Sequence, residues 1–295
     1  MKRILVTLVG VFLILLGIVG LFLPILQGWA LIFLGLTLVS PSVAGRLRRR
    51  ISRKFFKSGV VHLGEWKKSG VRAGFTTRHF PLIFHRTDDL LDPEKQREFA
   101  ARLVPSTKFA LLNQGHGDEV AVAEDADKYS KDGFYHFPQL DAALTNIPGL
   151  TLLVFTADCL SLFLSAGTWV GLVHAGWRGS QKKIAQKSLG LMVEKSGLKP
   201  DEVKIMFGPR IGAGHYEVGQ EFRQFFPASS LIEKNGRLCF DLAKETRRQL
   251  LEAGARAENI LDHGICTIEE NGDFYSFRKE KENAGRIISF ITCGL

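Results

Sequence analysis

The sequence predicts a mixed α/β or α+β fold, a β-sheet sandwich layered with helices, preceded by an N-terminal transmembrane hairpin. Two observations lead to this prediction. From about residue 71 onwards, short apolar runs alternate with helix-like segments, which is typical of mixed sheets covered by helices. Before that point, residues 4–39 contain no ionisable side chain, which is typical of membrane segments. The chain of 295 residues is long enough for one large domain or two modest ones.

The apolar N-terminus has two possible arrangements. Ile4–Leu23 would span about 30 Å as a helix, enough for one membrane crossing. The chain then either turns at Pro24–Gly28 to form a hairpin or continues as a single long crossing. In the hairpin, Ile25–Val39 would be only about 22 Å long and therefore tilted or re-entrant. We expect residues 4–39 to contact the membrane in both cases.

The charge distribution separates the chain into two parts. Residues 1–54 carry eight basic and no acidic side chains, so the other 241 residues have 31 basic and 30 acidic ones. A nearly neutral body argues against a nucleic-acid partner, which would require a basic face. The arginine-rich block at residues 46–50 predicts that the following domain faces the cytoplasm. Four cysteines without a Cys-x-x-Cys pair indicate reduced thiols.

We therefore divide the chain into three segments: a transmembrane hairpin or membrane anchor at 1–45, a basic linker at 46–70 and a catalytic domain at 71–295. The segment Leu23–Trp29 resembles the bacterial inner-membrane family named for a Pro-Gly-Pro-Gly-Trp motif. The first glycine and the second proline of that motif are not kept here. The resemblance implies an inner-membrane location.

Regular elements of the catalytic domain follow from local patterns. Val71–Thr77 is predicted as a strand from its β-branched and aromatic content, and Asp92–Arg102 as a helix because Pro93 suits a first turn. Apolar runs predict strands at Phe109–Leu112, Leu152–Phe155 and Trp169–Val173. Further helices are predicted at Ser180–Ser196, Gly219–Phe226 and Asp241–Ala253, and further strands at Val203–Phe207, Arg237–Phe240, Asn259–His263, Phe274–Phe277 and Ile287–Ile291.

Three chemically reactive residues each follow a predicted strand. His116 lies between two glycines, Cys159 follows Leu152–Phe155, and His174 follows Trp169–Val173. The last two strands are predicted to be neighbours, and strand ends of this kind are where sites are commonly built. Two imidazoles and a thiolate suit zinc, and three protein ligands leave a fourth position for water, whose pKa the metal lowers towards 7. Each residue alone could instead be an ordinary buried cysteine or a hydrogen-bonded histidine.

Other residues are candidates for binding an anionic substrate. Arg178 and Gly179 lie where a helix is predicted to begin, and free N–H groups there would bind phosphate. Arg78 could be a second anion clamp or a solvated arginine. Tyr216 follows a Gly-Pro-rich turn and could form a substrate wall. Asp158 could be a general base, could support a metal ligand, or could cap the next segment.

Several motifs occur in a distinctive order. They are Thr156-Ala157-Asp158-Cys159, His174-Ala175-Gly176-Trp177-Arg178-Gly179, Gly208-Pro209-x-Ile211-Gly212 with Tyr216-Glu217-Val218, and Cys266-Thr267 followed by Phe274-Tyr275-Ser276-Phe277-Arg278 and Gly285-Arg286. In this set the chain resembles the YfiH-like laccase-domain family, also described as multicopper polyphenol oxidases and as purine nucleoside phosphorylases. The likeness covers roughly residues 71–291.

The resemblance implies a mixed-sheet sandwich with a zinc held by His116, Cys159 and His174. It also implies phosphorolysis of adenosine, inosine, guanosine and methylthioadenosine, together with adenosine deamination. The chain departs from the family at His79–Pro81, which replaces a glycine- and serine-rich stretch, and at Gly214-His215, which replaces a common cysteine pair. Ser161 stands where a proline is usual.

Alternative functions remain open at this point. Copper-dependent phenol oxidation is less favoured, because the chain has eight histidines and no His-x-His pair. A cysteine hydrolase could use Cys159 with His174, and an editing activity on cell-wall precursors would suit a membrane tether. The protein could also be a catalytically silent metal-binding membrane protein. The sequence determines neither the preferred nucleoside nor the oligomeric state.

Overall fold

A computed structural model describes Val11 and residues 56–103, 108–124 and 133–294. The chain divides into two compact units, Met1–Lys57 and Ser58–Leu295, and the second contains nearly all described residues. The predicted transmembrane segment at residues 4–39 lies outside the described residues except for Val11. Within the described ranges, no helix combines the length and the apolar character needed to cross a membrane.

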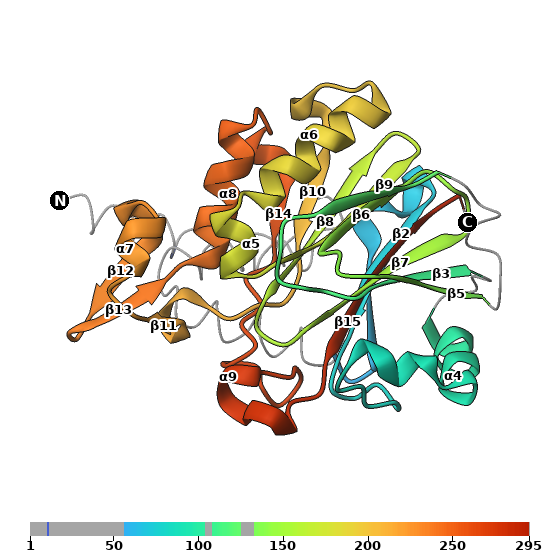
Figure 1. Ribbon diagram of the computed structural model, residues 1–295, viewed down its shortest axis with the longest axis horizontal. Helices are drawn as coiled ribbons and strands as arrows, with labels where there is room; N and C mark the ends of the chain where they lie inside the picture. Colours follow the sequence, from blue (N-terminus) through green and yellow to red (C-terminus); the bar gives the residue numbers. More distant parts are fainter. Residues whose placement is uncertain (1–10, 12–55, 104–107, 125–132, 295) are drawn as a thin grey trace. The chain divides into compact units, whose positions relative to one another are not determined.

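The second unit is built on two six-stranded sheets (Figure 1). The first has the order β1-β2-β15-β7-β3-β5. Its strands are β1 (Val60–Leu63), β2 (Val71–Thr76), β15 (Ile287–Cys293), β7 (Leu150–Thr156), β3 (Lys108–Leu112) and β5 (Phe134–Phe137). β15 is antiparallel to both its neighbours, whereas β3 is parallel to β7 and β5, so the sheet is mixed.

The second sheet has the order β14-β10-β8-β9-β6-β4. Its strands are β14 (Ile260–Asp262), β10 (Lys204–Phe207), β8 (Leu160–Ala166), β9 (Trp169–Ala175), β6 (Ala142–Thr145) and β4 (Val120–Ala123). The antiparallel hairpin of β8 and β9 forms its centre, and parallel pairs lie at both edges. A separate three-stranded sheet contains β11 (Glu217–Val218), β13 (Arg237–Phe240) and β12 (Leu231–Lys234).

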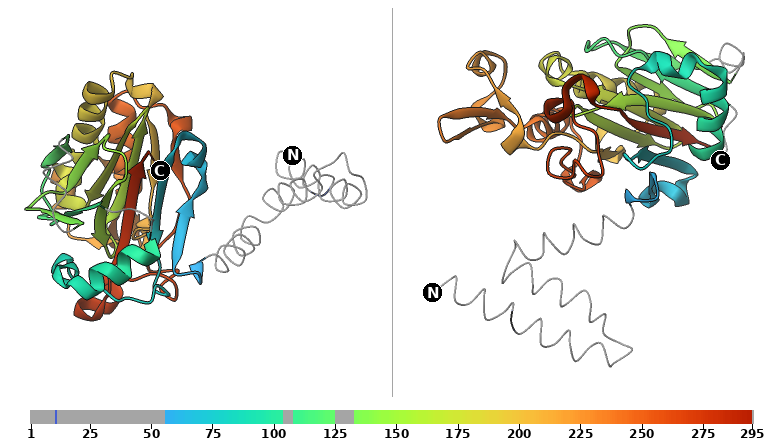
Figure 2. Two further views of the ribbon diagram at one scale, coloured as in Figure 1. Left: turned by 90° about the vertical axis from the view of Figure 1, so that its right-hand side faces the viewer. Right: turned by 90° about the horizontal axis from the view of Figure 1, so that it is seen from below.

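Helices cover the outer sides of the two large sheets. The α-helices are α4 (Pro93–Leu103), α5 (Trp177–Gln181), α6 (Ile184–Ser196), α7 (Phe222–Phe225), α8 (Leu242–Glu252) and α9 (Phe277–Glu280). On one side α6 and α8 pack on β8, β9 and β10, and on the other α4 packs on β3 through the rings of Phe99 and Phe109 (Figures 1 and 2). Every residue of β7, β8, β9 and β15 is buried, as expected for strands covered on both faces.

The structure confirms the predicted mixed sandwich but corrects two details near the site. The strands that precede Cys159 and His174 are β7 and β9, and they belong to different sheets rather than being neighbours. The predicted helix Ser180–Ser196 is two helices, α5 and α6, separated at Lys183, whose φ of 63° is left-handed. Ser180 therefore lies within α5 rather than at a helix start.

Two further segments differ from the prediction. Phe274–Phe277 is not a strand, because α9 begins at Phe277 and the preceding residues form turns. β1 pairs with β2 along its whole length, so the first sheet extends into the stretch expected to be linker. β8 was missed because Ser161 and Ser165 interrupt the apolar run that identifies buried strands.

Candidate functional site

The candidate site lies where the chain passes from one large sheet to the other. β7 ends at Thr156 in the first sheet and β8 begins at Leu160 in the second, with Cys159 in the short connection between them. His174 is near the end of β9, which pairs with β8. His116 follows β3 on the loop to β4, with a left-handed φ of 59°. Three distant parts of the sequence therefore meet at the junction of the two sheets.

The side chains of His116, Cys159 and His174, here called the donor triad, converge closely. Each offers one donor atom, and the three atoms lie within 4.8 Å of one another. The two imidazole rings stand edge to face, with centroids 4.9 Å apart. Gly176 makes room for this contact, because a Cβ there would lie 3.1 Å from the Cys159 sulfur. The convergence predicted from the sequence is thus present in the structure.

Asp141 holds both histidines of the donor triad in place. Its buried carboxylate accepts hydrogen bonds from the backbone N–H groups of Gly115, His116 and Gly117 at 2.7–3.1 Å. It also accepts a hydrogen bond from Nδ1 of His174 at 2.6 Å. Because an ionised carboxylate only accepts, Nδ1 carries a proton and Nε2 is left to act as a ligand. Asp141 is not among the residues predicted from the sequence, because its only signal is its position directly before an apolar run.

The electrostatics of the triad favour a thiolate. Burial raises the pKa of Cys159, but the charge of His174 and hydrogen bonds from both histidines outweigh it and lower this pKa to about 6. Burial lowers the pKa of His174, but the Cys159 thiolate and Asp141 outweigh it and raise this pKa to about 9. Asp141 keeps a lowered pKa despite its burial, chiefly through the bond from His174. The cluster therefore carries the deprotonated sulfur that a metal or a nucleophilic mechanism needs.

A cavity of about 390 Å³ opens onto the donor triad. Its lining includes all three triad residues together with Gln114, Phe155, Thr156, Ala157, Asp158, Ile211, Tyr216, Phe277, Arg278 and Arg286. The wall thus combines aromatic rings with two guanidinium groups. Such a cavity has the volume and the mixed lining of a small-molecule site.

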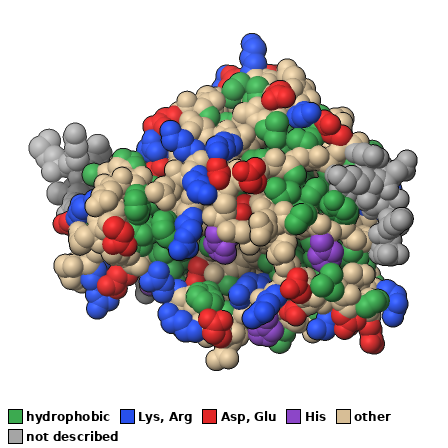
Figure 3. Space-filling model, in the orientation of Figure 1, with side chains coloured by type: hydrophobic (Ala, Val, Ile, Leu, Met, Phe, Trp, Pro, Cys, Tyr) green, Lys and Arg blue, Asp and Glu red, His purple; other side chains and the backbone are tan. Residues whose placement is uncertain are grey.

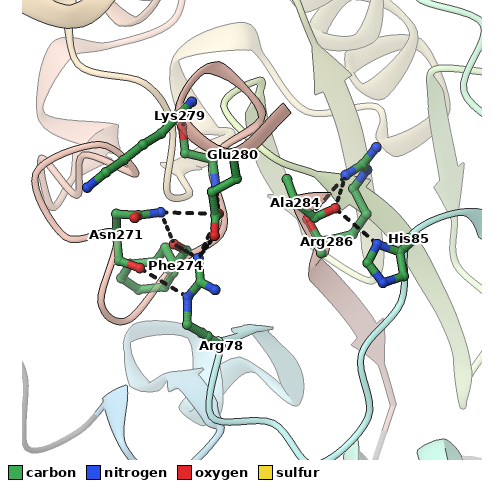
Figure 4. Close-up of polar contacts among 10 residues, drawn as sticks. Arg78, His85, Asn271, Phe274, Lys279, Glu280, Ala284 and Arg286 are labelled. Atoms are coloured by element: carbon green, nitrogen blue, oxygen red, sulfur yellow. Dashed lines mark hydrogen bonds and ion pairs between the residues drawn. The ribbon is translucent and has the colours of Figure 1, made fainter. Parts of the chain in front are cut away.

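The two cavity arginines come from the C-terminal part of the chain. Arg278 donates through its guanidinium to the Glu217 carbonyl at 3.0 Å and lies over the Tyr216 ring. Arg286 donates to the Ala284 carbonyl at 2.7 Å, and His85 contacts the same oxygen (Figure 4). Both arginines were part of the quoted motifs but were not identified as site residues, because nothing in their local sequence indicates where they point.

Asp158 and Tyr216 both line the cavity, and a wall position was predicted for Tyr216. Asp158 has a left-handed φ of 95° and accepts hydrogen bonds from the Thr267 hydroxyl and from the backbone N–H of Arg278, both at 2.6 Å. Both carboxylate oxygens are therefore engaged in holding the loop that carries Arg278. This arrangement supports a positioning role and not that of a general base. Burial raises the pKa of Tyr216 well above its usual value, so its hydroxyl stays protonated.

Three predicted anion-binding residues are not part of the cavity wall. Arg78 pairs with Glu280 at 2.6 Å, donates to the carbonyls of Asn271 and Phe274, and lies over the Tyr275 ring (Figure 4). Arg178 stacks on Trp177, and Gly179 is buried, with the Gly117 carbonyl oxygen 3.0 Å from where a Cβ would stand. α5 is too short to offer a strong helix-end charge. Arg78 thus holds the turn from Asn271 to Glu280 in this structure, and its role as an anion clamp stays a prediction.

Lys and Arg side chains gather on one face of the molecule. On the face seen in Figure 3, Lys and Arg side chains form a band beside a histidine near the middle of the view. Acidic groups are scattered around the same face without forming a continuous patch.

Comparison with known proteins gives a consistent result. Residues 62–294 match the family described as multi-copper polyphenol oxidoreductase laccase, and residues 3–54 match one described as putative transmembrane protein (PGPGW). The chain is 35% identical over 245 residues to a purine nucleoside phosphorylase of Deinococcus radiodurans, covering 79% of this chain and 88% of the relative. It is 32% identical over 211 residues to the purine nucleoside phosphorylase YfiH of Escherichia coli, covering 69% and 81%.

Solved structures with the same fold include two from bacilli. The crystal structure of the hypothetical protein YfiH from Bacillus licheniformis superposes with a TM-score of 0.69 at 23% identity, covering 80% of this chain and 97% of that one. The crystal structure of YlmD from Geobacillus stearothermophilus gives a TM-score of 0.67 at 25% identity, with coverage of 80% and 96%. The sandwich architecture is therefore shared with these proteins.

Proposed function

The chain belongs to the multi-copper polyphenol oxidoreductase laccase family, and we propose that it is a membrane-anchored, zinc-dependent purine nucleoside phosphorylase that also deaminates adenosine. The names of the relatives support the phosphorylase activity. The observation that carries the proposal is the donor triad at one end of a cavity whose wall also contains Arg278 and Arg286. One site thus offers a metal-binding set beside two cations for phosphate.

The donor triad fits zinc better than harder cations. Imidazole nitrogen and thiolate sulfur suit zinc, copper and other borderline or soft metals, whereas magnesium and calcium prefer oxygen ligands. The bond from His174 to Asp141 orients the imidazole in the way that metal-binding histidines are commonly oriented. When bound, zinc would supply Lewis acidity beside the cavity and leave one ligand position open.

The cavity wall offers groups that can bind both substrates, phosphate and the purine nucleoside. Arg278 and Arg286 would hold phosphate through charge-assisted hydrogen bonds, and Phe155 and Phe277 would pack against the purine ring. In phosphorolysis a phosphate oxygen forms a bond to C1′ while the bond from C1′ to the purine nitrogen breaks. The purine leaves with that electron pair and takes up a proton. We expect adenosine, inosine, guanosine and methylthioadenosine to be substrates.

The membrane anchor rests on the N-terminal sequence. Residues 3–54 match the transmembrane family, and residues 4–39 contain no charge. The arginine-rich block at residues 46–50 follows this apolar segment directly. The domain that contains the cavity would therefore face the cytoplasm at the bacterial inner membrane. Fractionation of cells should therefore recover the full chain with membranes, and a chain lacking residues 1–45 in the soluble fraction.

A cysteine hydrolase is the second candidate. The contact between Cys159 and His174, with the lowered pKa of the thiol, is also the arrangement of a cysteine nucleophile and its base. In that case chelators would leave activity intact and alkylation of Cys159 would abolish it. In the metalloenzyme, chelation abolishes activity and added zinc restores it.

The deciding experiment combines metal analysis with a nucleoside assay on the full chain in detergent. We expect a zinc ion at the donor triad that Cys159→Ala removes, and release of adenine, inosine or hypoxanthine from adenosine with phosphate. Copper in place of zinc, with oxidation of phenols, would identify the oxidase instead. Zinc at the triad without turnover of any purine nucleoside would identify a catalytically silent metal-binding protein. Either result would overturn the proposal.

A further inference from the structure

A second cluster of metal-ligating side chains lies outside the donor triad. It consists of His215, Cys266 and Glu269, whose donor atoms all lie within 4.8 Å of one another. His215 is in the turn before Tyr216, and the other two residues are in the turn after Ile265. We propose that this second cluster binds a zinc ion of its own, which joins the two turns. The proposal does not depend on the catalytic activity proposed above.

The spacing of the second cluster is close to that of a coordination shell. Zinc–ligand bonds of about 2.0–2.3 Å place tetrahedral ligands roughly 3–4 Å apart. Nε2 of His215 and Oε1 of Glu269 are already 3.4 Å apart. Both side chains can rotate, since they are 39% and 45% exposed. Small rotations would therefore bring them, with the Cys266 sulfur, around one ion.

The backbone holds the two turns together before any ligand binds. Arg210 and Cys266 form a parallel bridge, in which Arg210 donates to the Ile265 carbonyl at 3.2 Å and Thr267 donates to the Arg210 carbonyl at 2.9 Å. The N–H of Gly212 donates to the Cys266 sulfur at 3.2 Å. A preformed frame of this kind lowers the ordering cost of binding.

Gly212 is required for this close approach. A Cβ at this position would lie only 2.9 Å from the Cys266 sulfur and 3.9 Å from the His215 ring. The glycine therefore allows the sulfur to reach the space between the two turns. The N–H of Gly212 also contacts this sulfur directly, and this placement favours a sulfur that serves as a ligand.

The donor set determines the metal class. One nitrogen, one sulfur and one carboxylate oxygen suit zinc, and water would complete a tetrahedral shell. Binding would displace the Cys266 thiol proton to solvent. Because His215 and Glu269 are at the surface, an ion can enter directly.

The second cluster would stiffen one wall of the cavity. Tyr216, which lines the cavity, directly follows His215. Thr267, which donates to Asp158, directly follows Cys266. An ion bridging the two turns would hold both neighbours in their present positions. We therefore expect it to stabilise the folded chain.

The test uses the full chain in detergent, dialysed to equilibrium against zinc alone. Wild-type protein should bind two zinc ions, and Cys159→Ala, which removes the first site, should bind one. In the Cys159→Ala background, His215→Ala should reduce binding to less than a tenth. Zinc should raise the Tm of Cys159→Ala but not of the double variant. His263→Ala is the matched control, because this histidine also pairs with a surface glutamate.

Two results would overturn the proposal: a Cys159→Ala protein that binds no zinc, or one whose zinc survives His215→Ala. Glu269→Gln and Cys266→Ser should each weaken zinc binding in the same background, and the exposed Glu269→Gln keeps the test valid if Cys266→Ser fails to fold. The two proposals fail separately. If Cys159→Ala keeps all the zinc of the wild type and His215→Ala loses all of it, zinc binds at the second cluster. The proposed zinc at the donor triad would then be wrong.

Discussion

Asp141 and His174 are joined by two hydrogen bonds: Nδ1 of the imidazole donates to the carboxylate at 2.6 Å, and the His174 backbone N–H donates to the Asp141 carbonyl at 2.6 Å. The same carboxylate accepts the backbone N–H of His116 at 3.0 Å. One buried acid thus sets the position of both histidines. Most of the site's geometry depends on this residue.

Asp141→Asn should weaken zinc binding by about 10- to 100-fold, because the amide cannot accept all the bonds that orient the two histidines. A competition titration with a chromophoric chelator would measure the change. Asp118→Asn is the control, since this carboxylate lies two residues after His116 but pairs with surface lysines. Equal affinities for the two variants would contradict the assigned role of Asp141.

Gly176→Ala should impair zinc binding because the new methyl group would lie 3.1 Å from the Cys159 sulfur. The zinc content after dialysis should fall below that of the wild type. Gly190→Ala is the matched control in α6, where an added Cβ meets nothing within 4 Å. That substitution should raise stability by up to about 1 kcal/mol. Full zinc occupancy in Gly176→Ala would show that the sulfur can move without loss of the site.

Arg286→Met should raise the KM for phosphate and lower kcat/KM by about 10- to 100-fold, as expected from the loss of one or two charge-assisted hydrogen bonds. Steady-state kinetics with varied phosphate would measure both effects. Arg178→Met should change phosphate dependence little, because this side chain stacks on Trp177 and is outside the cavity wall. If Arg178→Met raised the KM for phosphate more than Arg286→Met did, phosphate would bind at the helix start, as the sequence suggested.

The Cys159 thiol should be unusually acidic in the metal-free protein. Its pKa is lowered to about 6, so the thiolate is present above about pH 6 and is lost as pH falls through that value. After chelation, the rate of iodoacetamide alkylation should therefore reach half its plateau near pH 6 and stay level up to pH 8. Cys159→Ala provides the background rate. A rate that still rises steeply near pH 9 would contradict the pairing with His174, and added zinc should suppress alkylation.

Arg78→Met should destabilise the fold by about 1–3 kcal/mol, because it removes the guanidinium group that pairs with Glu280 and donates to two carbonyl groups. Urea denaturation would measure the loss. Arg72→Met serves as a control on β2, the preceding strand. If Arg78→Met kept full stability but lost phosphate binding, Arg78 would be the anion clamp that the sequence suggested.

Local sequence was sufficient for much of this protein. Apolar runs located β3, β7, β9, β10 and β15, and Pro93 correctly marked the start of α4. The sequence also predicted that His116, Cys159 and His174 meet, because they follow strands or glycines within distinctive motifs, and the structure brings their donor atoms together. These features depend on neighbouring residues, which a single sequence displays directly.

The errors arose where long-range contacts decide the outcome. Arg78 and Arg286 are both arginines near glycines or turns, and nothing local distinguishes the one that holds a turn from the one that lines the cavity. Arg78 is turned away because Glu280, about two hundred positions later, pairs with it. Likewise, the sequence placed β7 and β9 side by side, whereas the connection through Cys159 takes the chain into the other sheet.

The sequence by itself determined which elements form, which residues carry reactive groups, and that the N-terminus is apolar and basic. Only the tertiary structure decided which reactive groups meet: the triad around Asp141, the arginines at the cavity, and the second cluster between two turns. The physical reason is that strand formation follows from adjacent side chains. The meeting of donor atoms depends on sheet pairing and on buried hydrogen bonds between residues far apart in the chain.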